Sequence, residues 1–185
     1  MGVELLSLSA TPSARLLSAL LLGVTAFLLT LFCLELIVFS GLISQLWFAT
    51  ALMTVVAFRT PSHQAPLLGC AAGTALANTL ILEPEPANLK FTLINLLQAI
   101  AGSVLLRQLL RCHAPLNTLL DWLRFMLSVG VLIPRLGGLL AVWMMHIRGE
   151  STLSFLFTWV IAESICMLGL VRLETHGSAS AQIVT

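Results

Sequence analysis

Long apolar runs separated by short polar breaks dominate the chain and predict helices that span a membrane. The six runs are 16–39, 42–58, 66–82, 91–110, 125–147 and 153–173. At 1.5 Å of rise per residue, a run of about 20 residues crosses the ~30 Å hydrocarbon core of a bilayer. Prolines lie in or beside most of the breaks, where helices end. We therefore expect an all-α, polytopic transmembrane bundle of about six spanning helices.

The same pattern divides the chain into a short N-terminal segment (1–15), an integral membrane domain (16–173) and a polar C-terminal tail (174–185). Pro134 is the one proline inside a run, so we expect it to distort the fifth helix. The second run is short, and residues 41–45 are expected to form an irregular entry to it. Residues 112–124 resemble an amphipathic segment that lies at the membrane surface.

Small residues at four-residue spacing indicate that some of these helices approach each other closely. The instances are Ala19 with Gly23, Gly69 with Gly73 and Ala77, and Gly130 with Pro134 and Gly138. Such spacing places small side chains on one helix face and lets two backbones come together in lipid. It predicts a compact bundle and carries no information about function.

Composition supports the membrane assignment and excludes several other classes of protein. Hydrophobic residues make up 58% of the chain and charged residues 9%, whereas a soluble domain carries about 25% charged residues. The mean hydropathy is +1.02. The formal net charge of +1 and the absence of a basic run give no indication of nucleic-acid binding. The first run continues into Glu35 without a small-residue cleavage site, so we expect a retained helix and not a secretory signal.

The arginine and lysine residues in the short breaks predict the orientation of the helices. If the N-terminus is cytoplasmic, the cytoplasmic side carries Arg15, Arg59, Arg107, Arg111, Arg124 and Arg172. The opposite side then carries Lys90 and Arg148. Basic residues accumulate on the cytoplasmic side of membrane proteins. We therefore expect a multi-pass protein of the bacterial inner membrane with both termini in the cytoplasm.

Two charged residues fall near the expected midplane of the membrane. Arg135 lies in the fifth run and Glu163 in the sixth, and the two runs are joined by a short loop. A charge at the centre of a bilayer costs roughly 2.5–3.5 kcal/mol on insertion scales, and pairing reduces this cost. We expect an ion pair between Arg135 and Glu163, which either fixes the two helices or takes part in signalling.

Four further polar residues are expected in the outer half of the bundle, at similar depth and facing its interior. They are Glu35, Asn78, Asn95 and Gln98. Buried amides in membrane proteins often hydrogen-bond between helices and simply hold them together. Converging polar groups also form the walls of ligand sites. Both interpretations stay open, and the second makes these residues a candidate signal site.

No catalytic, cofactor or metal motif is evident in the chain. Cys33, Cys70, Cys112 and Cys166 lack the spacing of a metal or redox motif. Sequence patterns of serine hydrolases, zinc proteases and phosphate-binding loops are absent as well. We expect neither an enzyme nor a bound cofactor.

Six segments together resemble a family of bacterial signalling domains: 27–36, 46–58, 94–110, 121–127, 133–140 and 157–173. Their order and spacing are similar to the first type of bacterial membrane-associated sensor domain, as found at the N-terminus of an enterobacterial multi-sensor diguanylate cyclase. The resemblance implies that conserved polar positions fall on Trp47, Asn78, Asn95, Gln98 and Glu163. The chain departs from the family pattern at Ala49, Arg135 and Arg172, and the family's last helices and output domain are not evident.

These features predict a sensory input domain of the inner membrane that lacks its own output domain. Its expected partners are the lipid bilayer and either a cytoplasmic signalling protein or a second copy of the chain; nucleic acid is not expected. Two alternatives remain. One is a six-helix solute-binding subunit of an uptake transporter, although the small-residue docking patch of such subunits is not found within the first run. The other is a nonfunctional, truncated remnant of a larger cyclase.

Overall fold

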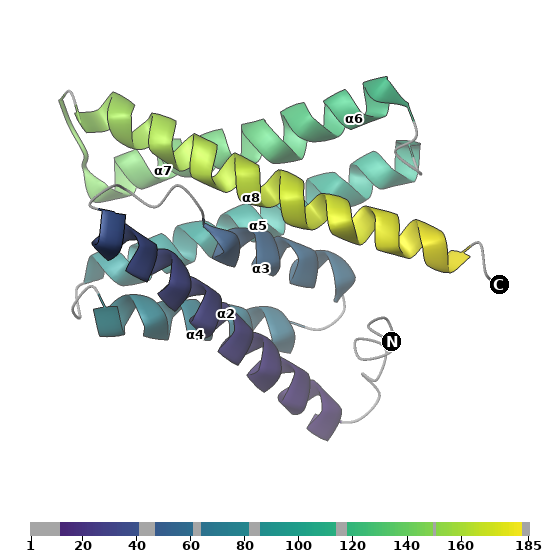
Figure 1. Cartoon of the computed structure of the whole chain (residues 1–185), viewed down its shortest axis with the longest axis horizontal. Coiled ribbons are helices and arrows are strands. Elements are labelled where there is room, and N and C mark those ends of the chain that lie inside the picture. Colours follow the sequence, from purple (N-terminus) through teal and green to yellow (C-terminus); the bar gives the residue numbers. More distant parts are fainter. Residues whose placement is uncertain are drawn as a thin grey trace.

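The structure is a computed structural model that describes residues 12–40, 47–60, 64–81, 86–113, 118–149 and 151–182. Every regular element in these residues is helical (Figure 1). In chain order they are α2 (Pro12–Ser40), α3 (Phe48–Arg59), α4 (Ala65–Ile81), α5 (Pro86–His113), α6 (Leu119–Phe125), η1 (Met126–Leu132), α7 (Ile133–Met145) and α8 (Ser151–Gln182). The predicted all-α fold is confirmed.

Four helical stretches are long and apolar enough to cross a membrane: Pro12–Leu36, Asn88–Leu109, Leu119–Met145 and Thr152–Gly169. The helices α3 and α4 are apolar but shorter. Large apolar side chains, such as Leu16, Leu20 and Leu28 on α2, are exposed on the outside of the bundle. Apolar surface of this extent is suited to contact with lipid chains and not with water.

Each predicted run corresponds to one helical segment, but several ends differ from the prediction. Residues 119–124 do not form a separate surface segment, because α6, η1 and α7 run on continuously as one stretch. The backbone of α8 stays helical to Gln182, beyond the end at 173 that the apolar pattern indicated. The predicted irregular entry at 41–45 lies outside the described residues.

The distortion expected at Pro134 takes the form of a π-helical segment, η1, which ends immediately before α7. A proline has no backbone N–H to donate to the carbonyl four residues earlier, so the regular α-helical ladder is interrupted. The N–H of Ile133 instead donates to the carbonyl oxygen of Ser128, five residues back. Wide turns of this kind satisfy backbone groups that a proline would leave unpaired.

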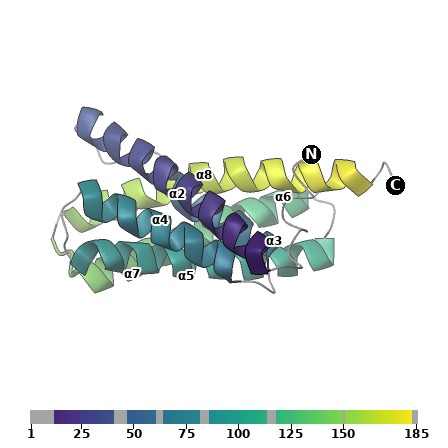
Figure 2. The ribbon, with the colours of Figure 1, turned by 90° about the horizontal axis from the view of Figure 1, so that it is seen from below.

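The helices α2 and α4 form one closely packed pair, in which α2 crosses obliquely over α4 (Figure 2). An added Cβ at Gly23 would lie 2.9 Å from the carbonyl oxygen of Gly69, and one at Gly73 would lie 2.9 Å from the carbonyl carbon of Gly23. Backbone touches backbone here, so only glycine fits. The small-residue spacing predicted close helix approach in general, and the structure places it between α2 and α4.

The helices α3, α5, α7 and α8 form a second unit, a four-helix bundle. The neighbouring pairs are α3 with α5, α5 with α7, α7 with α8, and α8 with α3. The α2–α4 pair packs against the α3 and α5 side of this bundle, and α6 and α7 lie on the side away from that pair (Figure 1). Side chains that point inward from all four helices of the bundle therefore meet along one axis.

Candidate functional site

Glu163 lies inside the four-helix bundle and is 2% exposed. Its Oε1 accepts a hydrogen bond from the Thr50 hydroxyl at 2.8 Å, which links α8 to α3. Its other oxygen, Oε2, has no hydrogen-bond partner. Half of a buried carboxylate is thus left for another group, and a buried acceptor without a partner costs about 1–3 kcal/mol.

The predicted ion pair between Arg135 and Glu163 is not formed. Arg135 is exposed, and no hydrogen bond or ion pair joins the two side chains in the described part of the chain. On α7 the buried face consists of Ile133, Pro134, Gly137, Gly138 and Ala141. Arg135 lies on the opposite, exposed face, so the estimate of its depth from sequence said nothing about the direction in which it points.

The start of α3 is docked against the same face of α8 by a second contact. The backbone N–H of Trp47 donates to the Cys166 sulfur at 3.1 Å. Cys166 follows Glu163 by three residues, so both side chains project from one face of α8. The two contacts hold Thr50 against Glu163 and orient the carboxylate.

Asn95 and Gln98 project from α5 into the bundle and are 1% and 4% exposed. Neither the oxygen nor the nitrogen of either side-chain amide has a hydrogen-bond partner. The Gln98 amide occupies the space that any side chain at Gly137 of α7 would fill. The glycine therefore provides room for an amide that would otherwise be excluded from the α5–α7 interface.

Two independent registers place these residues at one level of the bundle. The Thr54 Cγ2 methyl lies 3.3 Å from the place that a Cβ on Gly102 would occupy. Thr50 precedes Thr54 by one turn on α3, and Gln98 precedes Gly102 by one turn on α5, so Thr50 and Gln98 are level. Thr50 in turn binds Glu163.

The second register comes from an aromatic pair. The rings of Phe91 and Trp159 stack with their centroids 5.9 Å apart. Asn95 and Glu163 each follow one turn later, on α5 and α8. We call the set Thr50, Asn95, Gln98 and Glu163 the polar layer.

The remaining predicted site residues lie elsewhere. Asn78 is 2% exposed, and its amide nitrogen donates to the Thr92 hydroxyl at 3.4 Å, so it contacts α5 from the α4 side, one turn before Asn95. Its Oδ1 has no partner. Glu35 is exposed. The prediction that it faces the interior is wrong, because α2 buries the face carrying Ala26, Thr30 and Cys33.

Thr50, which holds the carboxylate, was not predicted as a site residue. The sequence carries a signal for it: Thr50 and Thr54 are spaced by four residues in a helix that is otherwise apolar up to Arg59, and both are fully buried. It was masked because a threonine satisfies itself within a helix by bonding to the carbonyl four residues back. Thr54 does this with Thr50, whereas Thr50 donates across to α8.

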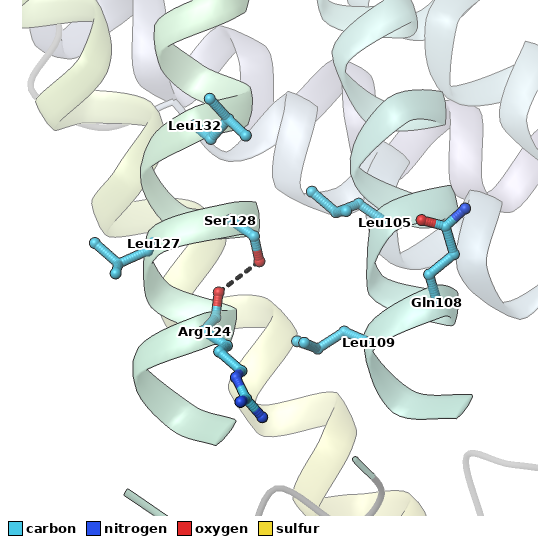
Figure 3. A pocket seen from close by; sticks show the side chains of 7 residues that line it. All are labelled: Leu105, Gln108, Leu109, Arg124, Leu127, Ser128 and Leu132. Carbon is cyan, nitrogen blue, oxygen red and sulfur yellow. Dashed lines mark hydrogen bonds between the residues drawn. The ribbon is translucent and has the colours of Figure 1, made fainter. Parts of the chain in front are cut away.

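An open groove of about 570 Å³ lies on the outside of the bundle, between α5 and the α6–η1 stretch (Figure 3). Leucines 105, 109, 127 and 132 line most of it. Two of its polar residues have internal contacts: Ser128 donates to the Arg124 carbonyl at 2.6 Å, and Arg124 pairs with Asp121 at 3.3 Å. No residue of the polar layer lines this groove.

Comparison with known proteins assigns the family. The MASE1 family model matches residues 17–172. The probable diguanylate cyclase DgcE of Escherichia coli (strain K12) is 39% identical over 160 residues, which cover 85% of this chain and 14% of that protein. The chain thus spans about one seventh of the length of this relative. No solved structure matches. The resemblance inferred from the six segments is confirmed: the chain belongs to the MASE1 family of membrane sensor domains.

Proposed function

We propose that this membrane sensor domain receives its signal at the polar layer and passes it through α8 to a cytoplasmic output related to diguanylate cyclases. The observation that carries the proposal is the set of unpartnered polar atoms inside the bundle. Both amide groups of Asn95 and Gln98 and one oxygen of Glu163 lack hydrogen bonds. Buried polar groups are nearly always paired, so a group of unpaired ones indicates a site that another species completes.

The position of Glu163 on α8 suggests how occupancy of the site reaches the output. α8 is the last helix of the described residues and contacts α3 and α7 directly. A ligand that bridges α5 to Glu163 favours one arrangement of α8 relative to its neighbours and shifts the population toward it. The C-terminal end of α8 would then transmit this shift to whatever lies beyond it in the cytoplasm.

This route requires six passes and cytoplasmic termini, which we propose from the distribution of arginine and lysine. The assignment includes α3 and α4, which are shorter than the four helices suited by length to cross a membrane. We expect the bilayer to thin locally around them, as it does around apolar stretches shorter than its hydrocarbon core. Reporter fusions at Thr185 test this topology: a cytoplasm-active reporter is expected there, and a reporter active only in the periplasm would contradict it.

The signal site is tested by replacing the matched region of the E. coli relative with residues 1–173 of this chain and measuring cyclic di-GMP. Asn95→Ala and Gln98→Ala are expected to change the output several-fold at normal membrane levels. Leu97→Ala is the matched control, because Leu97 is on the same helix and exposed. Output equal to the parent in both amide variants would reject the proposal, and loss of the protein from the membrane would show that the amides hold the helices together.

A further inference from the structure

The unpartnered atoms of the polar layer include three acceptor oxygens on two helices. These are Glu163 Oε2, Asn95 Oδ1 and Gln98 Oε1. The Thr50 hydroxyl oxygen lies beside the Glu163 carboxylate, since it donates its proton to Glu163 Oε1. One carboxylate, two amide oxygens and a hydroxyl are hard oxygen ligands, the kind that alkali and alkaline-earth cations prefer.

The charge of the layer favours a cation with a single charge. Its ionisable member is Glu163, and Arg135, the basic residue nearest in the expected depth, points away from it. An ionised carboxylate buried without a counter-charge costs several kcal/mol. One monovalent cation neutralises it, whereas a divalent cation would leave a buried positive charge.

The ligand set also argues against a transition metal. Among residues that the structure describes, no three His, Cys, Asp or Glu side chains gather in a group suited to a metal ion. The nearby Cys166 sulfur accepts the Trp47 N–H. Neutral amide oxygens with one carboxylate are typical of weakly held, exchangeable ions, as a sensor requires.

We propose that the polar layer binds one monovalent metal cation of the sodium class, with Glu163, Asn95 and Gln98 as ligands and the Thr50 hydroxyl completing the set. This inference rests on the proposed function and names the chemical class of its signal. The bound ion would join α5 to α8 and satisfy the three unpartnered oxygens. Each amide would direct its oxygen toward the ion, because rotation about the last side-chain torsion exchanges the positions of the amide oxygen and nitrogen.

The experiment measures thermal unfolding of the purified full chain in detergent, in sodium chloride and in N-methyl-D-glucamine chloride at equal ionic strength. A ligand that binds only the folded state raises the midpoint by mass action. At sodium about five times its dissociation constant, the expected rise is roughly 2–4 °C for a chain of this size.

Glu163→Gln keeps the shape of the side chain and removes the charge, so it is expected to abolish the sodium-dependent rise. If this variant does not fold, Thr50→Val and Asn95→Ala retain the carboxylate and are expected to weaken sodium binding at least several-fold. Arg135→Gln is the matched control, because it removes a charge from the exposed face of α7 and should leave the rise unchanged.

Equal midpoints in the two salts for the parent chain overturn the proposal, as does a rise of parental size in Glu163→Gln or Asn95→Ala. A stability that responds to pH but not to sodium would assign the site to a proton and overturn it as well. The sodium and pH dependence of the unfolding midpoint are both measured on the purified chain and involve no output domain. Absence of sodium binding with altered output in the amide variants of the chimera would therefore leave the proposed function standing, and sodium binding without altered output would reject that function alone.

Discussion

The α2–α4 contact allows one stability prediction to be worked out in detail. In Gly73→Ala the new Cβ would overlap the carbonyl oxygen of Gly23 and lie 2.9 Å from its carbonyl carbon and 3.1 Å from the Phe27 nitrogen. All three atoms belong to the backbone of α2, so no rotamer change can relieve the clash. The two helices must separate, and overpacking of this kind costs about 1–3 kcal/mol.

Helix propensity acts in the opposite direction, because alanine is favoured over glycine in a helix interior by roughly 0.5–1 kcal/mol. The clash is the larger effect, so we expect Gly73→Ala to lower the free energy of unfolding by about 1–2 kcal/mol. The matched control is Gly169→Ala on α8, where an added Cβ meets nothing within 4 Å.

The assay is unfolding in mixed micelles of rising denaturing-detergent fraction, followed by circular dichroism at a helical wavelength. Gly73→Ala should unfold at a lower fraction than the parent, and Gly169→Ala at an equal or higher one. If Gly73→Ala is as stable as Gly169→Ala, the backbone contact between α2 and α4 is not as close as the structure has it.

Three further changes test the bundle interior by the same assay. Thr50→Val removes the hydrogen bond to Glu163 and should destabilise by about 1–3 kcal/mol, because both carboxylate oxygens are then unpaired; an unchanged midpoint would contradict that bond. Arg135→Gln should change the free energy of unfolding by no more than about 0.5 kcal/mol, as expected of an exposed residue; a larger loss would indicate that Arg135 does pair with Glu163. Gly137→Ala should destabilise the parent but much less in a Gln98→Ala background, because its Cβ fills the place of that amide; additive losses in the double-mutant cycle would show that the two sites are independent.

The polar side chains show that the sequence gives the depth of a residue in the membrane but not whether it faces the bundle interior. Counting residues along an apolar run gives height in the membrane to within about a turn, because every residue adds 1.5 Å. On this basis Asn95 and Gln98 were expected in the bundle interior, and both are buried. Arg135 and Glu35 were assigned by the same count, and both are exposed.

The difference lies in the helix face, which a nearly uniform apolar run does not reveal. On α2, leucines occupy exposed and buried positions alike, as Leu28 and Leu34 show, since lipid is as apolar as the bundle interior. A soluble helix would identify its inner face by contrast with polar residues. Here only the packing of neighbouring helices decides which side is inside.

The sequence by itself determined the fold class, the number of helical segments, the family and the presence of helices that approach closely at small residues. Each of these follows from the length of apolar runs, the position of prolines or the spacing of small residues, which are local properties of the chain. The tertiary structure alone decided that Glu163 pairs with Thr50 and not with Arg135, and that Asn95 and Gln98 share its level. Those contacts depend on the rotation of each helix about its axis and on the register between helices, which are fixed when the helices pack together.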